Sequence, residues 1–219
     1  MKKVIIFDFD NTLVESLDDW KQMIDHDTAK HYGVDENPDF EPNRHGYSNK
    51  DTAKLFLKMH PTVDASYEEV VDYWYDYMEE KYRDHITYFE GAVEFLQALK
   101  DKGYKLVLAT ATGRKLLNKA FNIYDIKKHF DLVICEEDVG KSKMEPDIFI
   151  KIMEHFEVEV KDCLYFEDSA IAIKTASDLG IDCVAFVSRL NEKNIDKFNT
   201  MCIATTKSYS QKLIDKLSL

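Results

Sequence analysis

Two aspartates, Asp8 and Asp10, follow the short apolar run Val4–Ile6 near the N-terminus. Residues two apart on a strand share one face, so both carboxylates are predicted to project together where this strand ends. One carboxylate at such a place can attack phosphorus and form an acyl phosphate, and the other can transfer a proton. Two solvated carboxylates in a turn would give the same short pattern, so the motif by itself leaves this chemistry open.

Other polar side chains come at the ends of later apolar runs or, for Lys143, just before a predicted helix start. They are a hydroxyl, an ammonium and two carboxylates: Thr110, Lys143, Glu167 and Asp168. Each has an ordinary alternative, as a strand-end residue, a surface lysine or a pair of helix-capping acids. Together they would form a coherent site, because converging carboxylates repel one another unless a cation joins them. Oxygen ligands suit a hard ion, so the set predicts Mg²⁺ and a phosphoryl group bound beside it.

The spacing of apolar residues predicts the elements that would position these groups. Candidate strands lie at 4–9, 105–111, 131–135, 163–166, 183–187 and 201–204, and candidate helices at 91–102, 114–123, 146–156, 169–179 and 208–217. Strands and helices alternate from residue 90 onward, which predicts an α/β fold with a doubly wound parallel sheet. Ligands bind at the carboxyl ends of the strands in such sheets, where the polar side chains are expected.

The stretch from about residue 14 to 88 breaks this alternation and contains no clear strand. It is predicted to form helices at about 16–32, 49–59 and 67–83, and Val70, Trp74 and Met78 have the spacing of a buried helix face. We therefore predict a core domain of residues 1–15 and 87–219. The inserted helical domain is predicted to comprise residues 16–86.

Composition narrows the classes of partner. The chain has 219 residues with 29 Lys and Arg against 41 Asp and Glu, a formal net charge of −12. Nucleic acid is not expected as a partner, because a phosphate backbone needs a basic face. A membrane is not expected either, since no apolar run approaches the roughly 20 residues of a spanning helix. The prediction is a cytoplasmic protein, a monomer or weak homodimer, that acts on a small molecule.

The order of the motifs resembles the haloacid dehalogenase superfamily of phosphotransferases. The shared pattern is D-x-D-x-T at Asp8 to Thr12, then a strand-end Thr, a Lys and a Glu-Asp pair. The resemblance covers nearly the whole chain and is greatest to the small-cap branch that contains β-phosphoglucomutase and phosphoglycolate phosphatase. It implies a Rossmann-like core with a helical cap, Mg²⁺ as cofactor and a small phosphorylated metabolite as substrate.

The resemblance also implies roles for individual residues. Asp8 would be the nucleophile that forms a phosphoaspartate, and Asp10 the general acid and base. Thr110 and Lys143 would bind the phosphoryl oxygens, helped by backbone N–H groups near Asn11 and Ala111. The implied metal ligands are Asp8, the Asp10 carbonyl, Glu167 and Asp168.

The inserted segment carries a loop, Gly46 to Asp51, that resembles the substrate-selecting G-x-S-x-x-D/E loop of this branch. Gly46, Ser48 and Asn49 are therefore candidate substrate-binding residues. Arg114, just after the strand-end Thr110, is another.

Departures from the family pattern favour hydrolysis. Trp20 stands where β-phosphoglucomutases have a His, and Asn49 where they have a phosphate-binding Arg. A phosphatase is thus predicted ahead of the alternative, a phosphotransferase or mutase of the β-phosphoglucomutase type. A non-catalytic binding module is a third reading, but it would be expected to lack Asp8, Asp10 or Lys143, and all three are present.

Overall fold

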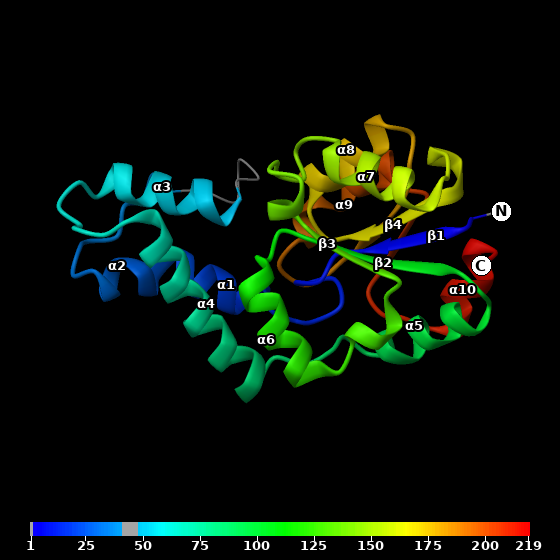
Figure 1. Ribbon diagram of the computed structural model, residues 1–219, viewed down its shortest axis with the longest axis horizontal. Coiled ribbons are helices and arrows are strands. Elements are labelled where there is room, and N and C mark those ends of the chain that lie inside the picture. The colour runs from blue at the N-terminus through cyan, green and yellow to red at the C-terminus, as the bar shows by residue number, and fades with distance from the viewer. Residues whose placement is uncertain (1, 41–47) are drawn as a thin grey trace.

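A computed structural model describes residues 2–40 and 48–219. Its sheet has six strands in the order β3-β2-β1-β4-β5-β6, and every neighbouring pair is parallel (Figure 1). The strands are β1 (Val4–Phe7), β2 (Lys105–Thr110), β3 (Leu132–Cys135), β4 (Cys163–Glu167), β5 (Asp182–Phe186) and β6 (Ala204–Thr206). The predicted α/β class with a parallel, doubly wound sheet is confirmed.

Helices cover both faces of the sheet, which explains why its strands are continuously apolar. On one face, Ile5 and Phe7 of β1 belong to the core that includes side chains of α5 (Ala92–Asp101), α6 (Arg114–Tyr124) and α10 (Gln211–Leu217). On the other, Val4 and Ile6 belong to the core with α7 (Asp147–Phe156), α8 (Ala170–Asp178) and α9 (Ile195–Met201). Successive residues of β1 therefore face opposite layers of helices, and every second residue faces the same layer.

The helices between β1 and α5 extend to one side of the sheet (Figure 1). They are α1 (Leu17–Gln22), a π-helical turn at Met23–Asp27, α2 (Thr28–His31), α3 (Asn49–Met59) and α4 (Tyr67–Asp84). The π turn interrupts the single helix predicted at 16–32. Across this turn the Thr28 hydroxyl donates to the Met23 carbonyl at 2.7 Å. Among the described residues, no helix is both long and apolar enough to cross a membrane.

The chain enters and leaves these inserted helices through two segments that lie side by side. Glu15 N donates to the Thr87 carbonyl at 2.9 Å, and Phe89 N donates to the Leu13 carbonyl at 3.0 Å. The loop after β1 is therefore tied to the segment that leads into α5. Both connections lie near the predicted domain boundaries, and the division into two domains stays a prediction.

The strand predicted at 201–204 is wrong in its position. Met201 ends α9, and β6 begins only at Ala204. The apolar run from Met201 to Ala204 spans the end of a helix and the start of a strand, and Ile203 between them is 54% exposed. A short apolar run can arise from either element, so periodicity alone could not separate them.

Candidate active site

Asp8 and Glu167, at the carboxyl ends of β1 and β4, meet Lys143, which lies in the loop before α7. Lys143 Nζ lies 2.6 Å from Asp8 Oδ1 and 2.8 Å from Glu167 Oε2. All three residues are buried. Burial opposes the charge on the ammonium, but the Asp8 and Glu167 carboxylates hold the pKa of Lys143 well above its usual value. The lysine is thus a fixed positive charge between two carboxylates that come from different strands.

Asp168 completes a cluster of three carboxylates beside this lysine. Asp8, Glu167 and Asp168 each offer one oxygen, and these oxygens lie within 4.8 Å of one another. Burial and the Glu167 charge raise the pKa of Asp8 to about 8, against the opposing effect of Lys143. Burial, Glu167 and Asp8 also raise the pKa of Asp168. One ammonium does not neutralise three carboxylates, and the oxygen donors fit a hard divalent cation.

Glu167 is fixed by contacts at both of its oxygens. Oε1 accepts from the backbone N–H groups of Asp168 at 3.1 Å and Ser169 at 2.9 Å, and Oε2 accepts from Lys143 and from the Tyr165 hydroxyl. Burial opposes the ionised form of Glu167, but Lys143 lowers its pKa below the usual value. Tyr165 was not predicted as a site residue, although the strand period places it on the same face as Glu167.

The backbone of Lys143 is fixed by Glu136, a buried residue just after β3. Lys143 N donates to Glu136 Oε1 at 2.7 Å. Burial raises the pKa of Glu136 to about 7. This contact holds the loop that carries Lys143, and no motif in the sequence singled out Glu136.

The Asp10 carboxylate accepts from a separate set of donors. Oδ1 accepts from Ser16 Oγ at 2.6 Å, Trp20 Nε1 at 3.0 Å and the Tyr82 hydroxyl at 2.6 Å, while Oδ2 accepts from the Thr112 hydroxyl. The donors come from the start of α1, from α4 and from the loop after β2. Sequence reasoning noted Trp20 only as a departure from the family pattern and missed the other three.

Asn11 follows Asp10 in the chain and contacts the carboxylate cluster through Asp168. Its backbone is in the left-handed region, with φ of 54°. Its side-chain Nδ2 donates to Asp168 Oδ2 at 2.6 Å. The sequence analysis expected a backbone contact with substrate at this position, and the structure adds a side-chain contact with a candidate metal ligand.

Thr110 and Ala111 lie where β2 ends. Thr110 is buried and its Oγ1 accepts from Thr112 N at 3.0 Å, while Ala111 is half-buried. Because β2 pairs in parallel with β1, Thr110 and Ala111 lie at the same edge of the sheet as Asp8. Their roles toward a phosphoryl group stay predictions.

The predicted substrate loop is described only in part, because Gly46 lies outside the described residues. Ser48 caps α3: its hydroxyl accepts from Asp51 N at 3.1 Å and donates to Asp51 Oδ2 at 2.7 Å. Asn49 begins α3, and its side chain lies beside the Tyr75 hydroxyl of α4. A substrate role for these residues stays a prediction.

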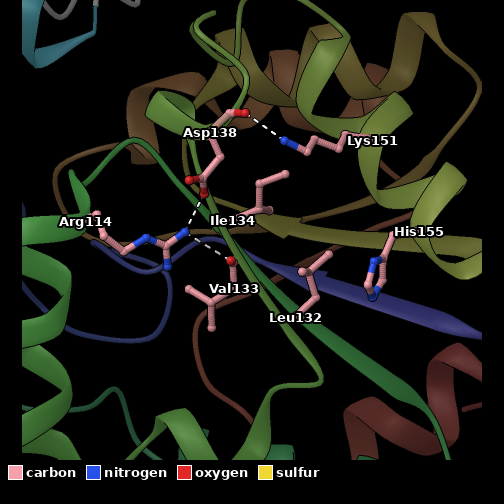
Figure 2. A pocket seen from close by; sticks show the side chains of 7 residues that line it. All are labelled: Arg114, Leu132, Val133, Ile134, Asp138, Lys151 and His155. Atoms are coloured by element: carbon pink, nitrogen blue, oxygen red, sulfur yellow. Dashed lines mark hydrogen bonds and ion pairs between the residues drawn. The ribbon is translucent and has the colours of Figure 1, made fainter.

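The structure does not bring Arg114 to the carboxylate cluster. Its guanidinium donates to the Val133 carbonyl at 3.2 Å and forms an ion pair with Asp138, as Figure 2 shows. Lys151 and His155 also line this pocket beside β3 (Figure 2). The predicted substrate contact by Arg114 would require it to leave these partners.

A family model described as haloacid dehalogenase-like hydrolase matches residues 5–186. This chain belongs to that family. The matched segment runs from β1 to β5 and includes the Asp8 cluster, Asp10 with its donors and the inserted helices. The resemblance inferred from the motifs is therefore confirmed.

Other members of the family are similar over different lengths. A phosphoglycolate phosphatase of Aquifex aeolicus is 27% identical over 81% of this chain and 81% of its own length. A phosphorylated carbohydrates phosphatase of Thermotoga maritima is 30% identical over 47% of this chain, and the match spans 48% of that protein. A haloacid dehalogenase-like hydrolase domain-containing protein of Arabidopsis thaliana is matched over 46% of its length. The crystal structure of CbbY from Rhodobacter sphaeroides in complex with phosphate shares the fold, with a TM-score of 0.79 at 17% identity over 96% of each chain.

Proposed function

We propose that this hydrolase is a Mg²⁺-dependent phosphomonoesterase that acts on a small phosphorylated metabolite through an aspartyl-phosphate on Asp8. The observation that carries the proposal is the contact of Lys143 with Asp8 and Glu167 inside a cluster of three carboxylates. Two of the relatives are named as phosphatases, one of phosphoglycolate and one of phosphorylated carbohydrates. Phosphoryl transfer requires positioning and charge neutralisation above all, and this site concentrates both.

In the first half of the reaction, an oxygen of Asp8 attacks phosphorus as the bond from phosphorus to the leaving oxygen breaks. Asp10 gives its proton to that oxygen, so the product leaves as an alcohol. Lys143 and Thr110 bind the phosphoryl oxygens and offset their charge. Asp8, Glu167 and Asp168 would hold Mg²⁺, which would supply further positive charge beside the phosphoryl group.

In the second half, water attacks the phosphorus of the phosphoaspartate. Asp10 accepts a proton from that water, and the bond from phosphorus to Asp8 breaks. Inorganic phosphate leaves, and both aspartates return to their starting states. The inserted helices restrict access to Asp10 because Trp20 and Tyr82 lie against it, which favours a small substrate.

The surroundings of Asp10 support hydrolysis over transfer to a second sugar hydroxyl. A mutase must bind a second phosphate on a bisphosphate intermediate, and cations are the usual partners of such a group. Among the residues that the structure describes, the four donors that contact Asp10 are all uncharged. Bisphosphate in the product mixture would instead indicate a mutase.

The test is phosphate release from a panel of phosphorylated metabolites and p-nitrophenyl phosphate, with Mg²⁺ and with a chelator. The wild type is compared with Asp8→Asn and with a matched control, Asp182→Asn. Asp182 pairs with Lys2 at 2.7 Å, and its side chain is 45% exposed. We expect release by the wild type and the control only with Mg²⁺, and none by Asp8→Asn. Turnover by Asp8→Asn at the wild-type rate would refute the proposed nucleophile.

A further inference from the structure

Tyr82 reaches from the inserted helices to the candidate proton donor. It lies in the last turns of α4 and is only 1% exposed. Its ring packs edge-on against Phe9, at 5.8 Å between ring centres, and against Tyr124 at 5.9 Å. This packing fixes the ring, so the hydroxyl is directed at Asp10 Oδ1, which it meets at 2.6 Å.

The two oxygens of Asp10 have unequal surroundings. A carboxylate oxygen has about two lone-pair sites, and Oδ1 already accepts from three donors, Ser16, Trp20 and Tyr82. An indole N–H can only donate. The Ser16 oxygen accepts from Asn11 N at 3.2 Å, which directs its own proton at Asp10. Oδ1 therefore has no free site for a proton.

Within the described parts of the chain, Oδ2 has one partner, the Thr112 hydroxyl. A hydroxyl can rotate, so it donates to an ionised oxygen and accepts from a protonated one. Oδ2 is thus the oxygen that can change its protonation without leaving a donor unpaired. The neighbouring Thr110, which accepts from Thr112 N, places this side of Asp10 next to the end of β2.

We propose that Tyr82 is a positioning residue for Asp10, which together with Ser16 and Trp20 fixes Oδ1 and leaves Oδ2 to give and take the proton. This inference rests on the proposed phosphatase function. Oδ2 loses its proton to the leaving oxygen as the phosphorus–oxygen bond breaks, and it regains one from the attacking water. The inserted helices then take part in acid–base catalysis, because α4 supplies one of the contacts that orient Asp10.

The test compares Tyr82→Phe with a matched control from the same helix, Tyr77→Phe. The Tyr77 hydroxyl also donates to a carboxylate, Asp27 Oδ2 at 2.8 Å, but it does not contact Asp10. Each variant is assayed with an alkyl phosphate, whose leaving group needs a proton, and with p-nitrophenyl phosphate, whose leaving group does not. General acid catalysis contributes about 10²–10⁴-fold, so we expect Tyr82→Phe to lower kcat/KM for the alkyl phosphate by about 10-fold or more. The p-nitrophenyl rate should change much less.

A merely structural effect of a variant would lower the rates with the alkyl phosphate and with p-nitrophenyl phosphate by the same factor. Any effect of Tyr77→Phe is expected to be of this kind. Ser16→Ala removes a second donor to Oδ1 and should show the same selective loss, which keeps the test decisive if Tyr82→Phe is poorly folded. Equal slowing of both substrates by Tyr82→Phe, or no slowing of either, overturns the inference. Absence of phosphate release by the wild type would refute the proposed function itself, whereas an active wild type with an inactive Asp8→Asn leaves that function standing.

Discussion

Asn11 offers a way to separate a side-chain contact from a backbone conformation at the candidate metal site. Its amide donates to Asp168 Oδ2 at 2.6 Å and to Ser188 Oγ at 3.2 Å. Its backbone has a φ of 54°, a conformation that glycine adopts freely and alanine does not. Asn11→Gly therefore removes the amide without adding strain, whereas Asn11→Ala removes the amide and adds strain.

The magnitudes follow from these two contributions. A partner that orients a metal ligand is typically worth about 10–100-fold in metal affinity, so both variants should bind Mg²⁺ more weakly by a similar factor in that range. Left-handed backbone costs a non-glycine residue about 1–2 kcal/mol, partly offset by the greater freedom of glycine in the unfolded chain. The alanine variant should thus be less stable than the glycine variant by about 1 kcal/mol, or about 2–4 °C in Tm for a chain of this size.

The assay is calorimetric titration of each variant with Mg²⁺, together with thermal melts of the metal-free proteins. We expect equal losses of Mg²⁺ affinity and melting temperatures in the order wild type, glycine variant, alanine variant. Wild-type affinity in Asn11→Gly with weak binding in Asn11→Ala would show that the backbone matters and the amide does not. Wild-type affinity in both variants would refute the role assigned to the contact with Asp168.

Three further changes test other parts of the site. The pKa of Asp8 is raised from the ordinary 3.8 to about 8, so its carboxylate destabilises the metal-free fold increasingly as the pH rises through that window. Melts in chelator should show the wild type losing stability relative to Asp8→Asn from low to high pH. Parallel curves for the two proteins would contradict this. Tyr165→Phe removes the hydroxyl that contacts Lys143 and Glu167, so we expect a stability loss of about 1 kcal/mol and a lower kcat at unchanged KM. An unchanged kcat would count against a role for this hydroxyl. A Cβ at Gly113 would overlap the Tyr75 hydroxyl and the Glu137 carboxylate, so Gly113→Ala should cost about 1–3 kcal/mol in a denaturant melt. A wild-type midpoint would contradict this.

Asp8, Glu167 and Asp168, which the sequence predicted as neighbours, share one property: each lies at or beside the end of an apolar run. Asp8 and Glu167 end adjacent parallel strands, so a pattern that identifies the strands also places these carboxylates together. Lys143 follows no strand directly, and only its family motif indicated that it would reach Asp8. Local pattern and motif order were sufficient for this part of the site.

The partners of Asp10 were not predictable in the same way. Val70, Trp74 and Met78 were predicted to be buried on one helix face, and they are. Tyr82 continues that spacing, and periodicity cannot distinguish a tyrosine that only fills the core from one whose hydroxyl meets a carboxylate 72 residues away. Such a contact depends on how α4 packs against α1, α3 and α6, which is a property of the folded chain.

The order of the strands has a consequence for synthesis on the ribosome. β1 leaves the ribosome first, yet it lies inside the sheet between β2 and β4, whose residues begin at Lys105 and Cys163. At translation speeds of about 5–20 residues per second, this apolar strand waits roughly 5–20 s for its first partner. Asp8 meets Glu167 and Asp168 later still, so a truncated nascent chain carries Asp8 without the rest of its carboxylate cluster. The apolar segment around Val4–Phe7 is then the part of the chain that most needs protection from aggregation until the sheet closes around it.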